Sequence, residues 1–408
     1  MTGMTASFLD EDAILPEEIQ PLSEPVDFAA DPARIFITGA TGFVAAYVMA
    51  ELLDTTPAHL YALVRADDVA HGMARIRKNL AHYWLWKEAY AERITPVIGD
   101  LKHPLLGLSS DDFAALARRV EVIYHVGSKL SYIAPYEFLR TANVGGTVEA
   151  LRLATTGRAK PFHFVSSLGI LLGFKSVPGA IPQGGLETDA LDAEKCPDVG
   201  YFQTKYVSER VVRHAADRGI PVTIHRIGLI VGDSRNGRSN EDDFVARILI
   251  GCIQAGYGPD IKNAMDMTPV DYAARSIVHL SRQPESVGKV FHILNPDPIT
   301  WSNIMDTVIE AGYPVRKLPF NEWVDAIEEH EDPMTNPLHP LLPFFHIQFA
   351  GRMLGVSETA YYALGTKLTQ SALDGSGLRC ATVDGALVRT FLAQYVETGR
   401  LRASMATA

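Results

Sequence analysis

The sequence predicts an α/β fold in which a doubly wound parallel sheet carries a smaller, mostly helical C-terminal region. Two patterns in the chain support this fold class. From Arg34 onwards, short β-branched runs alternate with longer helical stretches, as expected when helices cover both faces of a parallel sheet. The alternation breaks after the sixth expected strand, and residues 299–408 have mostly helical sequence, which indicates an appended region of different architecture.

Six strands are expected, each a short run rich in β-branched and aromatic residues. They span residues 34–38, 60–64, 94–98, 122–125, 162–166 and 222–226, and helical segments between them include residues 44–53, 135–154 and 201–218. In a sheet of this kind, ligands bind beyond the carboxyl ends of the strands. The residues that follow each strand are therefore the first candidates for a functional site.

The chain is expected to divide into three regions. Residues 1–33 are acidic and contain several prolines, as in a linker or an arm that lies on the surface. Residues 34–298 would form the main domain, with a polar, glycine-bearing substrate loop at 232–258. Residues 299–408, which include a proline-rich apolar loop at 333–343, would form a helical cap that shapes a substrate cleft.

The composition indicates a folded protein that does not bind nucleic acid or membranes. Hydrophobic residues make up 47% of the 408 residues, and the formal net charge of −11 disfavours polyanionic partners. Cys196, Cys252 and Cys380 lie far apart without metal-ligand spacing, and no signal peptide or apolar run of membrane-spanning length is found. We therefore expect a cytoplasmic protein without a metal site.

The first strand ends in a glycine turn of the kind that holds dinucleotides. Thr-Gly-Ala-Thr-Gly-Phe-Val at residues 38–44 leads from the strand into an apolar helix. In a Rossmann-type domain, the backbone N–H groups of such a turn and the helix N-terminus face the pyrophosphate. Gly39 would permit the tight turn, and Gly42 the close approach of the phosphate. The cofactor-binding candidates in this turn are Gly39, Thr41, Gly42, Phe43 and Val44.

Arg65 ends the second strand, at the place where this fold faces the adenosine ribose. An acidic residue there favours NAD, whereas an arginine accommodates the 2′-phosphate of NADP. Arg75, in the following helix, could share this phosphate. These two residues therefore predict NADPH as the cofactor.

Two further strand ends complete the expected cofactor site. Asp100 and Leu101 follow the third strand, a position suited to the edge of the adenine. Val126, Gly127 and Ser128 follow the fourth strand, where small residues would let the nicotinamide ribose approach. The dinucleotide would thus lie along the strand ends, from Arg65 towards the later strands.

Ser167, Tyr201 and Lys205 form the expected catalytic group. Tyr201 and Lys205 stand four residues apart at the start of a helical segment, so their side chains share one helix face. The lysine ammonium could favour the tyrosine phenolate, and Ser167 closes the fifth strand at the same edge. We expect Ser167 to hold a substrate oxygen and Tyr201 to protonate it. Lys205 would tune Tyr201 and bind the nicotinamide ribose, so Tyr201 and Lys205 also count as cofactor-binding residues.

In this order, these motifs resemble the extended short-chain dehydrogenase/reductase superfamily. Within it, the sequence is most similar to the thioester reductase (R) domain of nonribosomal peptide synthetases, polyketide synthetases and carboxylic acid reductases. Ala45 departs from the pattern, since a third glycine is usual there. The more discriminating shared segments are the arm at residues 9–21, Leu63-Val64-Arg65, Pro269-Val270-Asp271 and Asn295-Pro296.

The resemblance implies NADPH-dependent reductive release of an acyl or peptidyl thioester held on the phosphopantetheine arm of a carrier protein. The product would be an aldehyde, and a second reduction to the alcohol stays open, as does the identity of the acyl group. An acyl or peptidyl carrier protein is thus the expected partner. Its docking would need a local basic patch, for which Arg389, Arg400 and Arg402 are candidates.

Two alternatives stay open at the level of the sequence. One is a nucleotide-sugar or other small-molecule epimerase, dehydratase or reductase of the same superfamily, which Arg65 and the preceding arm disfavour. The other is a non-catalytic NADP(H)-sensing protein that binds partners. Such sensors commonly lose the catalytic tyrosine or lysine, and this chain keeps both.

Overall fold

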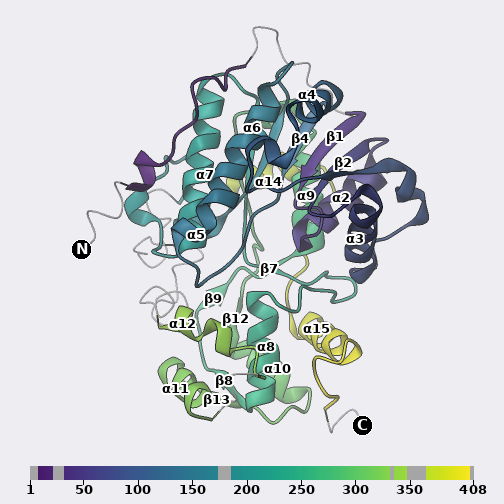
Figure 1. Cartoon of the computed structure of the whole chain (residues 1–408). Coiled ribbons are helices and arrows are strands. Elements are labelled where there is room, and N and C mark those ends of the chain that lie inside the picture. The colour runs from purple at the N-terminus through teal and green to yellow at the C-terminus, as the bar shows by residue number, and fades with distance from the viewer. Residues whose placement is uncertain (1–7, 22–31, 173–184, 331–334, 347–363, 405–408) are drawn as a thin grey trace.

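The structure is a computed structural model, and it describes residues 8–21, 32–172, 185–330, 335–346 and 364–404. Its centre is a seven-stranded sheet in which neighbouring strands pair in parallel (Figure 1). The strands are β1 (Arg34–Thr38), β2 (His59–Val64), β3 (Ile94–Ile98), β4 (Val122–His125), β5 (Phe162–Ser167), β6 (Val222–Ile227) and β11 (Val290–Ile293). They lie in the order β11-β6-β5-β4-β1-β2-β3, which confirms the doubly wound parallel sheet.

Helices cover both faces of the sheet, because alternate residues of a strand point to opposite sides. In β1, Phe36 packs into one apolar layer, whereas Ile35 and Ile37 pack into the other. The Phe36 layer contains α4 (Ser110–Arg119), α6 (Gly146–Thr155) and α7 (Gly200–Asp217). The opposite layer contains α2 (Phe43–Thr55), α3 (Val69–His82), α9 (Val270–Ser281) and α14 (Lys367–Leu373). These two layers form the core of the main domain.

Two details of the main domain differ from the sequence-based expectation. The seventh strand, β11, is not among the expected strands, because it is short and lies after the segment where the alternation of strands and helices breaks. The helix expected over residues 135–154 is divided into α5 (Tyr136–Arg140), a π-helical turn at Thr141–Gly145 and α6. Gly145 and Gly146 stand at the division, and glycine weakens a continuous helix.

A smaller region with its own apolar core lies beside the sheet domain, at the bottom of Figure 1. Its helices are α8 (Phe244–Ala255), α10 (Trp301–Glu310), α11 (Phe320–His330), α12 (Leu342–Phe345) and α15 (Gly385–Glu397). Short strands join them: β7 (Ile230–Val231) pairs with β10 (Thr268–Pro269), β8 (Tyr257–Pro259) with β13 (Arg316–Leu318), and β9 (Ala264–Met265) with β12 (Ile299–Thr300).

This region does not coincide with residues 299–408. The prediction of a loop at residues 232–258 is wrong for its second half, which forms α8. This helix is buried on most sides in the core of the smaller region. The polar, glycine-bearing flanks at residues 232–243 and 256–258 favour a loop, although the segment between them is predominantly apolar. In the other direction, α14 returns to the main domain and packs against β11 and α9.

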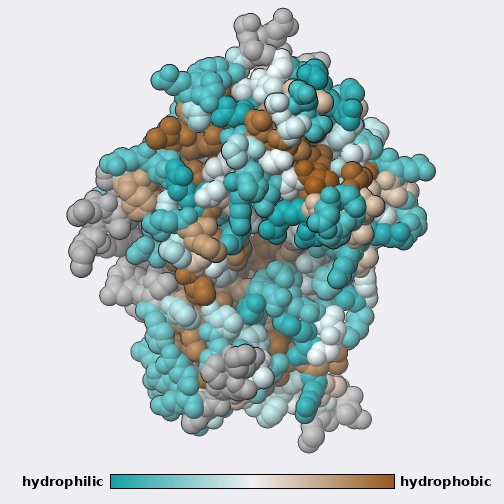
Figure 2. Space-filling model, in the orientation of Figure 1, coloured by the Kyte–Doolittle hydropathy of each residue, from teal (hydrophilic) through white to brown (hydrophobic). Residues whose placement is uncertain are grey.

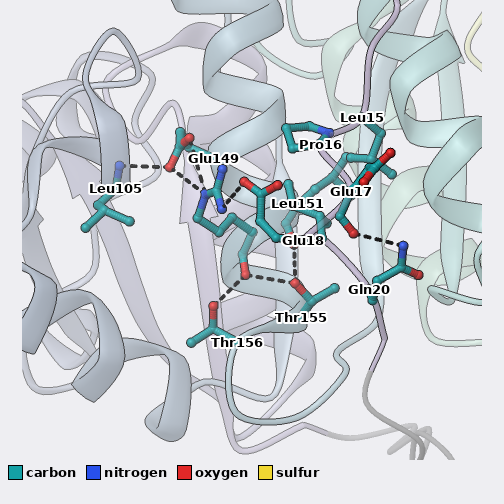
Figure 3. A network of polar contacts seen from close by, with 12 residues as sticks. Leu15, Pro16, Glu17, Glu18, Gln20, Leu105, Glu149, Leu151, Thr155 and Thr156 are labelled. Carbon is teal, nitrogen blue, oxygen red and sulfur yellow. Dashed lines mark hydrogen bonds and ion pairs between the residues drawn. The ribbon is translucent and has the colours of Figure 1, made fainter.

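The N-terminal arm at residues 8–21 is fastened to the helices of the Phe36 layer. Its apolar side chains Leu9, Ala13, Leu15 and Ile19 are buried in that layer. Its polar groups form ion pairs with the same helices (Figure 3), among them Glu18 with Arg152 of α6 at 2.9 Å. Because both faces of the arm are engaged, residues 8–21 form part of the folded domain. Residues 1–7 and 22–31 of the expected arm lie outside the described residues.

Candidate active site

A cleft of about 590 Å³ lies at the carboxyl ends of the strands, between the main domain and the smaller region. Figure 2 shows a hollow between the two parts of the molecule, with hydrophobic residues at its floor. The cleft brings together the following predicted site residues: Gly39, Thr41, Gly42, Phe43, Val44, Arg65, Asp100, Leu101, Val126, Gly127, Ser128, Ser167, Tyr201 and Lys205. Arg75 does not line the cleft. Its guanidinium donates a hydrogen bond to the main-chain oxygen of Arg65.

The glycine turn at the start of α2 is shaped by a close backbone contact. Gly39 has a φ of +82°, and a Cβ atom at this position would lie 2.7 Å from the Cα atom of Gly127. The Gly127 N–H donates a 2.9 Å hydrogen bond to the Thr38 hydroxyl. The turn after β1 and the turn after β4 are thereby held together, with no room for a side chain between them.

The N-terminus of α2 fits a negatively charged group. Gly42 is its N-cap residue, no side chain caps the helix, and no acidic residue stands in its first turn. The first N–H groups of a helix have no partner within the helix, and the helix dipole makes this end partly positive. The open helix end and the glycine cradle beside it therefore match the pyrophosphate of a dinucleotide.

The three residues expected to be catalytic face the other part of the cleft. Ser167 is the last residue of β5, and its hydroxyl accepts a 3.0 Å hydrogen bond from the Gly169 N–H. Tyr201 lies in the first turn of α7. Lys205 follows one turn later, and its ammonium donates a 2.7 Å hydrogen bond to the main-chain oxygen of Val165. The start of α7 and the end of β5 thus place all three side chains at one strand-end edge.

Burial sets the protonation of Tyr201 and Lys205. It raises the pKa of Tyr201 to about 12, against a hydrogen bond with Ser128 that lowers it. Burial lowers the pKa of Lys205 to about 7, against the nearby charge of Glu209 that raises it. The phenol of Tyr201 is therefore protonated at neutral pH and can act as a proton donor. From the sequence, Lys205 is expected to favour the phenolate of Tyr201, but burial outweighs the other influences and raises the pKa of Tyr201 instead.

His125 ends β4 next to the site but is fully engaged in the interior. Its Nδ1 atom lies 2.9 Å from the Thr38 hydroxyl and its Nε2 atom 3.0 Å from the Thr147 hydroxyl. Burial, followed by the charge of Lys205, lowers the pKa of His125 to about 3. A neutral ring held on both sides joins β1, β4 and α6 below the cleft, so His125 acts as a packing residue.

Sequence reasoning expected a substrate loop at residues 232–258 but named no individual residue on the substrate side of the cleft. Lys129, Leu130 and Tyr132 follow β4, and Asp243 and Phe244 come from the start of α8. The prediction covers only the first three residues after β4, and the start of α8 lies in the segment expected to be a loop. Asp243 caps α8 by accepting a 2.8 Å hydrogen bond from the Ala246 N–H, and burial raises the pKa of this carboxyl to about 7.

The three arginines considered for carrier docking lie in or after α15. Arg389 is 3.8 Å from Glu310, in an exposed ion pair. Arg400 pairs with Glu241 at 3.6 Å and with Asp242 at 3.1 Å. Arg402 is exposed. The acidic partners of Arg389 and Arg400 offset part of the positive charge that a docking patch would need.

Two kinds of feature are missing from the part of the chain that the structure describes. No helix in that part has both the length and the apolar character needed to cross a membrane. Within the same residues, no group of three or more His, Cys, Asp or Glu side chains is arranged to hold a metal ion.

Comparison with known proteins identifies the family. Residues 37–277 match the NAD-binding family described as "Male sterility protein". The chain is 37% identical over 383 residues to a linear gramicidin synthase of Brevibacillus parabrevis, a match that covers 93% of this chain and 7% of that protein. It is 33% identical over 405 residues to aldehyde reductase lnaA of Aspergillus flavus, with 94% of this chain and 38% of that protein covered. The chain therefore spans only a part of each of these curated relatives.

A solved structure supports the same assignment over the whole length of the chain. It is the terminal R domain from the myxalamid PKS-NRPS biosynthetic pathway, with a TM-score of 0.87 and 37% identity. The match covers 98% of this chain and 99% of that domain. The chain thus belongs to the Male sterility protein family of NAD(P)-binding oxidoreductases, within the extended short-chain dehydrogenase/reductase superfamily, and is of the reductase (R) domain type known from nonribosomal peptide and polyketide synthetases.

Proposed function

We propose that this R domain catalyses the NADPH-dependent release of an acyl or peptidyl group from a carrier-bound thioester as an aldehyde. One observation carries the proposal: Ser167, Tyr201 and Lys205 line the same cleft as the glycine turn and Arg65. A proton donor and a dinucleotide cradle in one cleft are what the reduction of a carbonyl group requires. Similarity to a gramicidin synthase and to an aldehyde reductase supports both the thioester and the aldehyde.

The cofactor would lie along the strand ends. Gly39, Gly42 and the N-terminus of α2 would hold its pyrophosphate, as their geometry fits. Arg65 would bind the 2′-phosphate as a charge-assisted pair, and Arg75, bonded to the main chain of Arg65, would support it. Further on, Asp100 and Leu101 would contact the adenine, and Val126, Gly127 and Ser128 the nicotinamide ribose. When bound, NADPH supplies the hydride for the carbonyl carbon.

The chain's own residues would manage the proton and the charge on oxygen. The hydroxyl groups of Ser167 and Tyr201 would hold the carbonyl oxygen and stabilise the negative charge that develops there. Because its pKa is raised to about 12, Tyr201 is protonated and would give its proton to that oxygen. The resulting hemithioacetal then breaks its carbon–sulfur bond, which yields the aldehyde and the free thiol. A second round on the aldehyde would give the alcohol.

The proposal also covers the partner protein and the cellular compartment of this chain. A phosphopantetheine arm would bring the thioester into the cleft from the protein surface. Docking at Arg389, Arg400 and Arg402 would need Arg400 to exchange Glu241 and Asp242 for acidic groups of the carrier. The cytoplasm is the expected compartment, because the cysteines lie isolated in the sequence.

Product analysis with a defined thioester tests the proposal. The protein is incubated with a butanoyl-pantetheine thioester and NADPH, and thiol release, NADPH oxidation and aldehyde are measured in the same sample. We expect one thiol released for each molecule of aldehyde and alcohol formed together. The Tyr201→Phe variant serves as the control, because it keeps the ring but lacks the proton donor. Absence of both thiol release and NADPH oxidation across a broad thioester panel would overturn the proposal.

A further inference from the structure

Tyr132 stands between the catalytic cleft and a second cavity. The second cavity has a volume of about 300 Å³. Among the described residues, Tyr132 is the one that lines both spaces. The first turn of α7 completes the partition, because Tyr201 and Phe202 line the catalytic cleft whereas Val199 and Gly200 line the second cavity.

The Tyr132 ring is held by aromatic side chains from both parts of the molecule. Its centroid lies 6.4 Å from the ring of Tyr201 and 6.3 Å from the ring of Phe202, both in α7. On the other side, Phe244 of α8 lies at 5.3 Å and Phe344 of α12 at 5.4 Å. Aromatic pairs at such distances attract one another beyond the area they bury. The ring is therefore fixed as a wall next to the proposed proton donor.

Apolar and polar residues both line the cleft around Tyr201. Tyr132, Phe202 and Phe244 are aromatic, which suits a hydrocarbon chain. Lys129, Asn240 and Asp243 also line the cleft, and their polar groups suit the amides of a pantetheine arm. A thioester whose carbonyl lies at Tyr201 could therefore place its acyl chain against Tyr132 and the amides of its thiol arm at polar residues of the cleft.

The second cavity lies beyond this wall and has a mixed lining. Its apolar part comes from Phe8 of the N-terminal arm, Ile133, Ala134, Pro135 and Val199, and its polar part from Tyr136, Glu137, Asp198 and Gln203. Burial of a chain against its apolar residues would be favourable, at roughly fourfold in affinity for each methylene group. Tyr132 is the described residue that the two spaces share.

We propose that Tyr132 sets the longest acyl chain that this domain reduces efficiently, by closing the catalytic cleft against the second cavity. The preferred substrates are thioesters of short apolar acyl groups, and the second cavity is a latent subsite for longer chains. This inference rests on the proposed reduction of thioesters. Tyr132 acts here as a specificity-determining residue, without a role in proton transfer.

A chain-length series tests the inference without a carrier protein. Butanoyl, hexanoyl, octanoyl, decanoyl and dodecanoyl thioesters of pantetheine are reduced by the wild type and by Tyr132→Ala, and kcat/KM is plotted against length. For the wild type we expect kcat/KM to fall once the chain reaches the ring. In Tyr132→Ala the fall should move to longer chains, with a gain of about fourfold for each methylene that enters the second cavity. NADPH affinity should stay the same.

Two further variants separate an open wall from a general loss of packing. Tyr132→Phe keeps the ring and should keep the wild-type profile. Ala134→Leu, added to Tyr132→Ala, fills the second cavity and should remove the gain for long chains. If Tyr132→Ala does not fold, Tyr132→Leu replaces it, because leucine keeps an apolar contact but leaves the opening.

The outcomes distinguish this inference from the proposed function. An unshifted profile in Tyr132→Ala, or an equal loss at every chain length, overturns the role of Tyr132 and leaves thioester reduction standing. A gain for long chains that Ala134→Leu does not remove overturns the role of the second cavity. A wild-type protein that reduces no thioester of any length overturns the proposed function, and this inference with it.

Discussion

Gly39→Ala should damage both folding and cofactor binding, by amounts that the geometry of the turn determines. A residue with a side chain at a φ of +82° pays about 1–2 kcal/mol for the left-handed conformation. Its Cβ atom would also lie 2.7 Å from the Cα atom and 2.9 Å from the backbone nitrogen of Gly127, so backbone has to move. Such overpacking costs about 1–3 kcal/mol. The sum, about 2–5 kcal/mol, is a large part of the usual 5–15 kcal/mol of unfolding free energy.

Gly288→Ala is the matched control. Gly288 has a φ of +78°, but a Cβ atom there would meet nothing within 4 Å. The Gly288→Ala variant should therefore lose only the free energy of unfolding that comes from the left-handed backbone conformation, about 1–2 kcal/mol. Urea denaturation of both variants gives the two free energies of unfolding. The difference between them, about 1–3 kcal/mol, measures the contact between the turns after β1 and β4.

Cofactor titration completes this test. In Gly39→Ala the displaced turn should weaken NADPH binding by about tenfold or more, since 1.4 kcal/mol of lost contact is already a factor of ten. Gly288 lies outside the cleft, so Gly288→Ala should bind NADPH like the wild type. Equal losses of stability in the two variants, together with unchanged NADPH affinity in Gly39→Ala, would refute both the contact and its role as a cradle.

Three further predictions follow from the site and its surroundings. Tyr201→Phe should lower kcat for thioester reduction by about a hundred- to ten-thousand-fold with unchanged NADPH affinity. Lys205→Ala should lower both kcat and the affinity for NADPH. Wild-type turnover in Tyr201→Phe would contradict the role of Tyr201 as proton donor. Arg65→Ala should weaken NADPH by about ten- to a hundred-and-fifty-fold, the worth of a charge-assisted bond, and barely affect NADH; equal losses for both cofactors would show that Arg65 does not bind the 2′-phosphate. Burial lowers the pKa of His225 from 6.5 to about 3, so between these values the unfolded chain binds more protons than the folded one. The contribution of His225 to the free energy of unfolding should be fully present above pH 6.5 and be lost as the pH drops towards 3. The free energy of unfolding should therefore fall more steeply with decreasing pH in the wild type than in His225→Leu. Identical slopes in denaturation series at several pH values would rule out this contribution.

Features that depend on neighbours in the sequence could be predicted from it. The six expected strands, the glycine turn at residues 38–44 and the four-residue spacing of Tyr201 and Lys205 are all local patterns. A parallel sheet then brings the strand ends to one edge, so Ser167 and Arg65 meet in one cleft although they lie far apart in the chain. Regular topology converts local patterns into a site.

Features that depend on burial could not be predicted in this way. The spacing of Tyr201 and Lys205 indicates that the lysine would act on the tyrosine, yet burial raises the pKa of Tyr201 to about 12 and lowers that of Lys205 to about 7. Burial causes both shifts, and it depends on elements distant in the sequence that pack against α7, among them α5, α6 and β5. The sequence of residues 201–218 alone does not predict how deeply this helix is buried.

Tyr132 illustrates the same limit for substrate choice. In the sequence it is one aromatic residue in the connection that follows the strand ending at His125. Its position as a wall depends on Phe202 in α7, Phe244 in α8 and Phe344 in α12, three segments that lie far from Tyr132 and from one another in the sequence. The strand ends supply the chemistry that the superfamily shares, and such connections supply the shape of the acyl site. The residues that distinguish one substrate from another should therefore be sought where the local sequence is least regular.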